Sequence, residues 1–313
     1  MNISIGPLEE PELPEADRIF RVAFGTFLGL PDPAAFAGDS DWVTTRWRAD
    51  PTAAVGAYID EAVVGSNFAT RWGSFAFFGP LTVRPDLWDK GVAKRLLEAT
   101  MALFESWGTR QAALFTFPHS TKHVALYQRF GFWPQQLTAV MSKRIEPTAP
   151  AQSWSAYSSL SLGERERCLA ECRGLTEAVF PGLDVSLEIT SVAAQRIGDT
   201  VLLRDGETLS ALAICHIGAG SEAGSNHAYV KFGAARPGPS AAQHFGQLLS
   251  ACEALAGARG AGEVVAGVNT ARHDAYRSMI ARGFRTSLLG IAMQRPDEPG
   301  YNRRDCFVMD DWR

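Results

Sequence analysis

The chain has 313 residues, of which 46% are apolar and 20% charged, and its net charge is −4. Two domains of ordinary size account for this length, and the apolar content is sufficient for two cores. We expect no nucleic-acid or membrane partner, because no Lys/Arg run and no apolar stretch of about 18 residues is present. The opening residues lack the pattern of a signal peptide, which favours a cytoplasmic protein.

The five cysteines are scattered and odd in number. Cys168 and Cys172 are four residues apart, but no further His or Cys pair stands nearby to complete a zinc site. The sequence therefore predicts reduced thiols and no bound metal.

In the first half, hydrophobic periodicity and turn residues predict alternating strands and helices. The expected hairpin turns at Asp60-Glu61, Gly79-Pro80 interrupts a later strand, and Gly131 ends a helix. The predicted elements are a strand at 2–7, a helix at 14–28, strands at 53–59, 62–70 and 75–83, a helix at 91–107, a strand at 112–117, a helix at 121–130 and a strand at 137–142.

The second half repeats the first. A shift of 152 residues places Arg84-Pro85 on Arg236-Pro237 and Gly131-Phe132 on Gly283-Phe284 without gaps. Matching elements are predicted at 201–204, 210–217, 228–234, 240–256, 263–268 and 274–282, with a last strand at 305–309. We predict an α/β fold with a mixed sheet in two tandem domains, residues 1–146 and 153–313, joined by a Pro/Ala/Ser-rich linker.

The loop after residue 83 is the most informative stretch. A strand ends at Val83, and a helix begins near Gly91. Backbone N–H groups at a helix start lack internal partners and favour a phosphate. Gly91 and Ala93 leave the backbone accessible, and Lys90 and Lys94 add positive charge. Alone, this pattern is also typical of ordinary helix packing.

The wider passage resembles motif A of the GCN5-related N-acetyltransferase (GNAT) superfamily. There, a strand ending in Val-x-Pro leads to Gln/Arg-x-x-Gly-x-Gly/Ala and a Leu-Leu helix, and Val83, Pro85, Gly91, Ala93 and Leu96-Leu97 match it. Trp88 replaces the usual Gln or Arg. A second family signature, Tyr-x-x-x-Gly-Phe, is met by residues 127–132, with Ser120 in place of the usual Asn.

The resemblance implies an acetyl-coenzyme A site in the first domain. The pyrophosphate would lie on the backbone of Trp88, Asp89, Lys90, Gly91, Val92 and Ala93, beside Lys94. The pantetheine would pair with the main chain of the strand carrying Leu81 and Val83. An N–H near Val83 would polarise the thioester carbonyl.

Two side chains are candidates for proton transfer. Tyr127 matches the family's usual general acid, which protonates the departing thiolate, although a buried packing role is the alternative for a helical tyrosine. His119 follows the strand at 112–117 and could accept the amine proton, or it could be an ordinary loop histidine. His123 shares a helix face with Tyr127, and Asp39, Asp41 and Asp86 could bind a cation or lie on the surface.

The second half lacks the chemical positions. Gly91, Ala93 and Tyr127 correspond to Gln243, Phe245 and Met279. Phe245 would block the close approach that Ala93 permits, and Met279 cannot donate a proton. The second domain is therefore expected to be a degenerate copy of the first.

The sequence thus predicts an N-acetyltransferase that moves the acetyl group of acetyl-CoA to a primary amine of a small molecule, by direct attack in a ternary complex. Two alternatives stay open: a non-catalytic protein that binds CoA or another ligand, and a transferase of a different acyl group. Residues 29–47 and 71–74 are expected to line the substrate site. The sequence does not specify the amine, or whether the protein is a monomer or a homodimer.

Overall fold

The structure is a computed structural model that describes residues 2–145 and 154–313. The predicted linker lies outside these residues. The described helices are α1 (Leu13–Phe27), α2 (Val43–Ala49), α3 (Val92–Ser106), α4 (Thr121–Gln128), α5 (Leu162–Val179), α6 (Ser186–Gln195), α7 (Ala241–Ala258) and α8 (His273–Ala281). None of them combines the length and apolar character needed to cross a bilayer.

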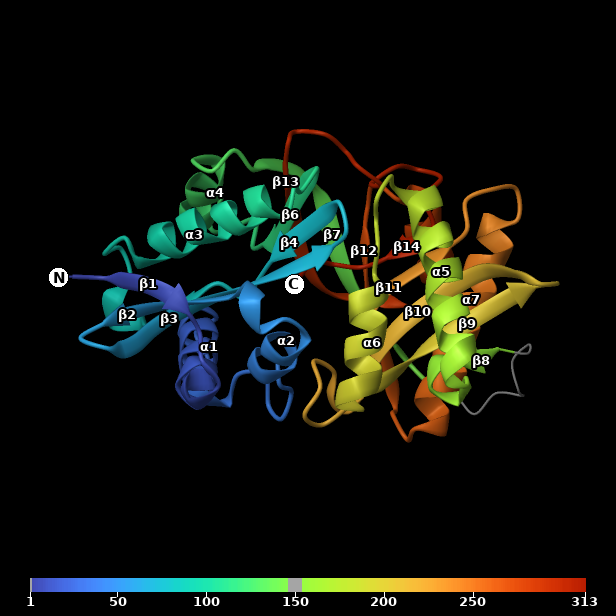
Figure 1. The fold of residues 1–313 in the computed structure, drawn as a ribbon, viewed down its shortest axis with the longest axis horizontal. Helices are drawn as coiled ribbons and strands as arrows, with labels where there is room; N and C mark the ends of the chain where they lie inside the picture. The colour runs from blue at the N-terminus through green and yellow to red at the C-terminus, as the bar shows by residue number, and fades with distance from the viewer. Residues whose placement is uncertain (1, 146–153) are drawn as a thin grey trace.

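The described strands form one sheet (Figure 1). They are β1 (Ser4–Pro7), β2 (Ala54–Ile59), β3 (Ala62–Trp72), β4 (Phe75–Phe78), β5 (Thr82–Val83), β6 (Gln111–Thr116), β7 (Trp133–Arg144), β8 (Ser155–Ala156), β9 (Gly198–Asp205), β10 (Thr208–Gly218), β11 (Gly224–Ala235), β12 (Glu263–Asn269), β13 (Arg285–Arg295) and β14 (Val308–Met309). The main path runs β1-β2-β3-β4-β6-β13-β7-β12-β11-β10-β9-β8, while β5 pairs with β3 and β14 with β11.

The predicted mixed α/β fold is confirmed, and each predicted element overlaps an observed one. The hairpin β2–β3 turns at Asp60 and Glu61, whose positive φ angles of 49° and 66° suit a tight two-residue turn. Helices α2 and α6 and strands β8 and β13 were not predicted. Helix α5 begins with a capping box between Ser161 and Glu164, a start signal that is independent of hydrophobic periodicity.

The two halves exchange their last long strands. By the sequence repeat, β7 corresponds to β13 and β6 to β12. Within one half, β6 would pair with β7, yet β6 pairs with β13 and β12 pairs with β7, all antiparallel. Strands β7 and β13 also pair with each other at the centre of the sheet (Figure 1). The two halves therefore share one continuous sheet.

Strand β4 divides two hydrophobic cores. Phe75 and Phe77 point into a cluster built mainly from the second half, where Trp312 lies 5.2 Å from Phe75 between ring centroids. Ala76 and Phe78 point the other way, into a cluster with residues of α3 and α4. In Figure 1, α3 and α4 lie on one side of the first-half strands and α1 and α2 on the other.

A close backbone contact also joins the halves at the β3–β4 turn. Ser74 N–H donates to the carbonyl of Gly182 at 2.8 Å, and Asp184 N–H donates to the carbonyl of Trp72 at 3.3 Å. Gly73 has a φ of +64°, and a Cβ there would lie 2.1 Å from the Gly182 oxygen. Only glycine fits this position without moving the second half.

We predict that Gly73→Ala lowers the free energy of unfolding by about 1–3 kcal/mol more than Gly108→Ala does. Gly108 is a matched control because its φ is +63° and a Cβ there meets nothing within 4 Å. Both variants share the left-handed strain, so the difference reports the clash alone. Urea denaturation measures it, and equal losses for the two variants would contradict the close contact.

Candidate functional site

The site begins where β4 and β6 diverge. These parallel strands pair from Phe75–Gln111 to Phe77–Ala113. Beyond Phe78 the chain passes through Gly79-Pro80, where the sequence predicts an interruption of the strand. Strand β5 follows and pairs with β3, the same neighbour that β4 has on the side away from β6. The described pairing with β6 thus ends before residues 79–83, which pair with β3 only, and we call this divergence of the two strands the wedge.

The loop between β5 and α3 ends at an open helix start. Gly91 is the N-cap of α3, with a φ of +83°, and no side chain of the described residues caps the helix. A Cβ at Gly91 would meet nothing within 4 Å. The N–H groups of Val92, Ala93 and Lys94 belong to the first turn and lack partners within the helix. Their partial positive charge suits an anionic group, and the space around a Cβ at Gly91 is free.

The side chains of this loop have structural roles. The Trp88 indole N–H donates to the Val83 carbonyl at 2.8 Å, so this nitrogen holds the loop against the end of β5. Leu81 and Val92 pack in the core beside Val83. Where the family pattern has a polar side chain, Trp88 thus forms a hydrogen bond within the loop itself.

The charged residues around the loop are exposed. Asp89 pairs with Lys122 of α4 at 2.5 Å, and Lys94 pairs with Glu98 at 3.5 Å. Such exposed pairs contribute little stability and exchange partners readily. Lys90 is exposed as well. Lys90, Lys94 and Lys122 are therefore placed where an anion at the start of α3 could recruit them.

Tyr127 lies on α4 next to the wedge. Its side chain is 7% exposed, and its ring centroid is 5.7 Å from that of Phe78, the last residue of β4. Burial raises the pKa of the Tyr127 phenol well above its usual value, and the Thr116 side chain at the end of β6 offsets part of that rise. The phenol therefore stays protonated at neutral pH, whether it serves packing or proton donation.

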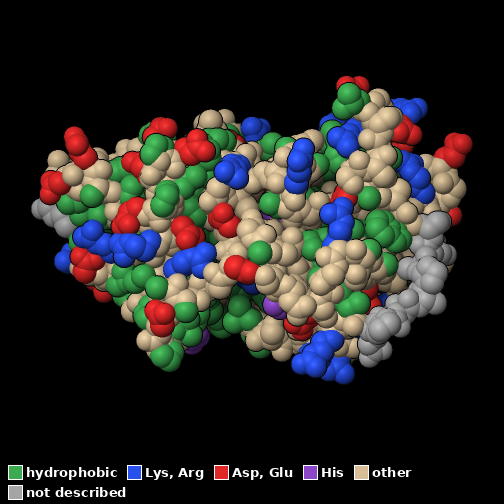
Figure 2. Space-filling model, turned by 90° about the horizontal axis from the view of Figure 1, so that it is seen from below, with side chains coloured by type: hydrophobic (Ala, Val, Ile, Leu, Met, Phe, Trp, Pro, Cys, Tyr) green, Lys and Arg blue, Asp and Glu red, His purple; other side chains and the backbone are tan. Residues whose placement is uncertain are grey.

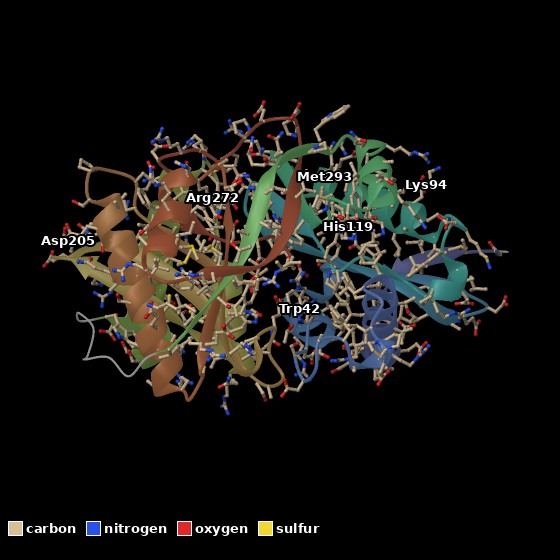
Figure 3. The ribbon with its side chains drawn as sticks, turned by 180° about the vertical axis from the view of Figure 1, so that it is seen from behind. Trp42, Lys94, His119, Asp205, Arg272 and Met293 are labelled. Atoms are coloured by element: carbon tan, nitrogen blue, oxygen red, sulfur yellow. The ribbon has the colours of Figure 1, made fainter. Side chains whose placement is uncertain are left out.

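The two histidines form an aromatic cluster with Phe27 of α1. The Phe27 ring stacks on His119, with centroids 5.8 Å apart, and lies 5.1 Å from His123. Figure 3 labels His119 among the first-half elements. His119 is exposed, whereas His123 is half-buried. Burial lowers the pKa of His123, helped by the charges of Lys122 and His119, so its imidazole is neutral at pH 7.

The acidic residues named from the sequence have local partners. Asp39 accepts hydrogen bonds from the N–H and hydroxyl of Ser225 in the second half, which lowers its pKa. Asp41 accepts from the Thr44 N–H at 2.8 Å, and Asp86 pairs with Arg84. Within residues 2–145 and 154–313, no group of three or more His, Cys, Asp or Glu side chains is arranged to hold a metal ion. All five cysteines are buried and free.

The equivalent positions of the second half are part of its core. Phe245 and Met279 are fully buried and belong to one hydrophobic cluster. The Phe245 ring packs on Phe307, with centroids 5.5 Å apart. The side chain that replaces Ala93 therefore fills the interior, and the one that replaces Tyr127 is apolar.

One group of residues near the wedge was not expected from the sequence. Arg46 of α2 contacts the Gly79 carbonyl and forms an ion pair with Glu222, 176 residues away in the chain. Separations of this size leave no local sequence signal. On the face of the molecule that Figure 2 shows, acidic and basic side chains are interspersed, without a large patch of one charge.

Comparison with known proteins identifies the fold. The acetyltransferase (GNAT) family profile matches residues 18–132. A proposed acetyltransferase from Pyrococcus horikoshii superposes with a TM-score of 0.68 at 12% identity, covering 97% of this chain and 93% of that one. A GCN5-related N-acetyltransferase from Sphaerobacter thermophilus gives a TM-score of 0.61 at 16% identity, covering 95% and 96%.

A third structure, a GCN5-related N-acetyltransferase from Anabaena variabilis, has a TM-score of 0.54 at 12% identity and covers 94% of this chain and 72% of that one. No curated protein matches the sequence significantly. At these identities the likeness shows the fold over nearly the whole chain, while the family profile matches the part that carries the site. Residues 18–132 therefore match the acetyltransferase (GNAT) family profile, and nearly the whole chain shares the fold of the solved GCN5-related N-acetyltransferases.

Proposed function

We propose that this protein transfers the acetyl group of acetyl-CoA to a primary amine of a small molecule. The observation that carries the proposal is the open, uncapped start of α3 directly beside the wedge between β4–β5 and β6. Tyr127 stands next to the same wedge and keeps its proton. In this proposal an anion site, a strand edge for the pantetheine and a proton donor would adjoin one another.

The start of α3 would bind the diphosphate. The N–H groups of Val92, Ala93 and Lys94 would donate to its oxygens, and Lys90 would add charge from the loop. The half-buried Ala93 and the bare Gly91 leave room for this approach. Trp88 and Asp89 would contribute main chain rather than side chains.

The wedge would hold the pantetheine and the thioester. Leu81 and Val83 would pair with the pantetheine amides through their main chain, as an added strand would. A backbone N–H at this strand would donate to the thioester oxygen and stabilise the negative charge that develops when the amine nitrogen attacks the carbonyl carbon. As the carbon–sulfur bond breaks, Tyr127 would donate its proton to the leaving sulfur.

The attacking amine must first lose a proton, since a free alkylamine has a pKa near 10. His119 is the candidate base, because it follows β6 and is exposed to an incoming molecule. His123, neutral at pH 7 and in contact with the same Phe27 ring, would be the second candidate for this role.

Acetyl-CoA should bind and stabilise the protein, and Gly91→Asp should weaken this binding about tenfold or more, because a carboxylate at the helix start repels a diphosphate. Gly108→Asp is the matched control at the other end of α3, with similar φ and open space. Isothermal titration calorimetry measures both variants. If the wild type does not bind acetyl-CoA, or if Gly91→Asp and Gly108→Asp bind it with equal affinity, the diphosphate site is rejected.

Tyr127→Phe should reduce kcat about 100-fold, with little change in the acetyl-CoA Kd, because only the proton donor is lost. Thiol release with a panel of amines measures the rate. Tyr157→Phe, a buried tyrosine of the second half, controls for loss of a buried hydroxyl. Undiminished turnover of Tyr127→Phe would leave Tyr127 a packing role, and cofactor binding without thiol release for any amine would favour a binding protein.

His119→Ala should lower kcat/KM about 100-fold at pH 7. The difference in kcat/KM from wild type should shrink as the pH rises towards the pKa of the amine. At high pH the amine is already neutral and needs no base. The pH profiles of His119→Ala, His123→Ala and wild type, compared from pH 6 to 10, make the assignment. A deficit that is constant with pH would exclude His119 as the base.

A further inference from the structure

A buried ion group connects the two halves beside the wedge. The carboxylate of Glu222, in the β10–β11 loop, accepts from Arg46 Nε at 2.8 Å and Nη2 at 3.0 Å. It also accepts from Lys231 Nζ on β11, at 2.9 and 2.7 Å. The side chains of Arg46, Glu222 and Lys231 are 5%, 1% and 3% exposed. Two buried cations therefore share one buried carboxylate.

Arg46 carries this group to the interrupted strand. Its Nη1 donates to the carbonyl of Gly79, and its Nη2 also donates to the backbone oxygen of Arg313. The N–H of Gly79 donates to the Phe68 carbonyl of β3 at 2.8 Å. The backbone of Gly79, where the chain leaves β4, is thus held from β3 on its N–H side and from Arg46 on its carbonyl side.

Lys231 contacts the same strand directly. Its Nζ lies 5.7 Å from the ring centroid of Phe77 in β4 and 5.9 Å from that of Trp42, which stands at the start of α2. Arg46 also packs on Trp42, at 4.9 Å. Figure 3 shows Trp42 where the two halves meet. The second half therefore contacts β4 directly at Phe77 and reaches Gly79, where the path to β5 begins, through Arg46.

The charges in this group depend on one another. Burial alone would raise the pKa of Glu222, but the charges of Arg46 and Lys231 outweigh it and hold that pKa far below its usual value. Burial lowers the pKa of Lys231, and the neighbouring Arg46 adds to that effect while Glu222 opposes it. Removing the carboxylate leaves Arg46 and Lys231 with the Glu188 carboxylate as the remaining acidic neighbour that acts on both, so the repulsion between the two cations increases.

We infer that Glu222 and Lys231 of the second half are positioning residues for the cofactor strand of the first half, acting through Arg46 on the Gly79 carbonyl. This inference rests on the proposed function and assigns a task to the half that lacks the acetyl-CoA motif. According to this inference, the second half sets the direction in which residues 79–83 continue from β4. That direction determines how far these residues lie from β6. Displacements of about 1 Å at such a strand are enough to cost about 100-fold in rate.

The test compares Glu222→Gln with Glu253→Gln. The second variant makes the same change in a partly buried ion pair with Lys143, between α7 and β7, and is expected to keep wild-type kinetics. For Glu222→Gln we expect the KM and Kd of acetyl-CoA to rise about tenfold or more, with the KM of the amine unchanged. Amide hydrogen exchange of residues 79–83 should quicken in the protein without cofactor.

A double-mutant cycle tests the route through Arg46. In an Arg46→Gln background, Glu222→Gln should add less than twofold to the acetyl-CoA Kd, because the contact with Gly79 is already lost. If Glu222→Gln does not fold, Lys231→Met, which keeps the Arg46–Glu222 pair, should give a smaller rise in Kd and faster exchange. The inference is overturned if the variant that folds is less stable but keeps the wild-type acetyl-CoA Kd and the wild-type rate of amide hydrogen exchange at residues 79–83. A wild type that does not bind acetyl-CoA instead rejects the proposed function, while exchange still reports on the positioning.

Discussion

The reciprocal exchange of β7 and β13 is the constraint on which the rest of the structure depends. Each strand pairs with a strand of the other half, so neither half can complete its sheet alone. The shared sheet fixes the distance between the halves to that of neighbouring strands, about 5 Å. Long-range contacts such as Asp39 with Ser225 and Arg46 with Glu222 follow from this fixed placement.

Strand β4 transmits this constraint to the site. Its alternating side chains fill both cores, so Phe77 is held by the second half while Phe78 contacts Tyr127 in the first. A strand buried on both faces has little freedom to shift. The chain parts from β6 beyond Phe78, at Gly79-Pro80, and stays paired with β3 through β5, and the wedge begins at that point. The rigidity of the cores and the opening of the site therefore have one origin.

Much of this was predictable, because the signals are local. The 3.6-residue period of α1, the turn at Asp60-Glu61 and the glycine at the start of α3 each act within a few residues. The exchange of β7 and β13 was not predictable, since two similar copies offer similar strand edges and sequence alone does not say which edge is used. Neither was the hydrogen bond from Trp88 to Val83, because a tryptophan in place of a polar residue gave no sign of its partner. Arg46 and Glu222 meet only through the fold.

The two copies carry different side chains at equivalent helix starts. At the start of α3, Ala93 and the uncapped N–H groups leave backbone unsatisfied and accessible, which lowers stability but permits an anion to bind. At the equivalent place in α7, Phe245 is buried in the core and contributes hydrophobic stabilisation instead, on the order of 2–3 kcal/mol. Under the proposed function, the second half keeps a packed helix start, while the first keeps an uncapped one for the cofactor.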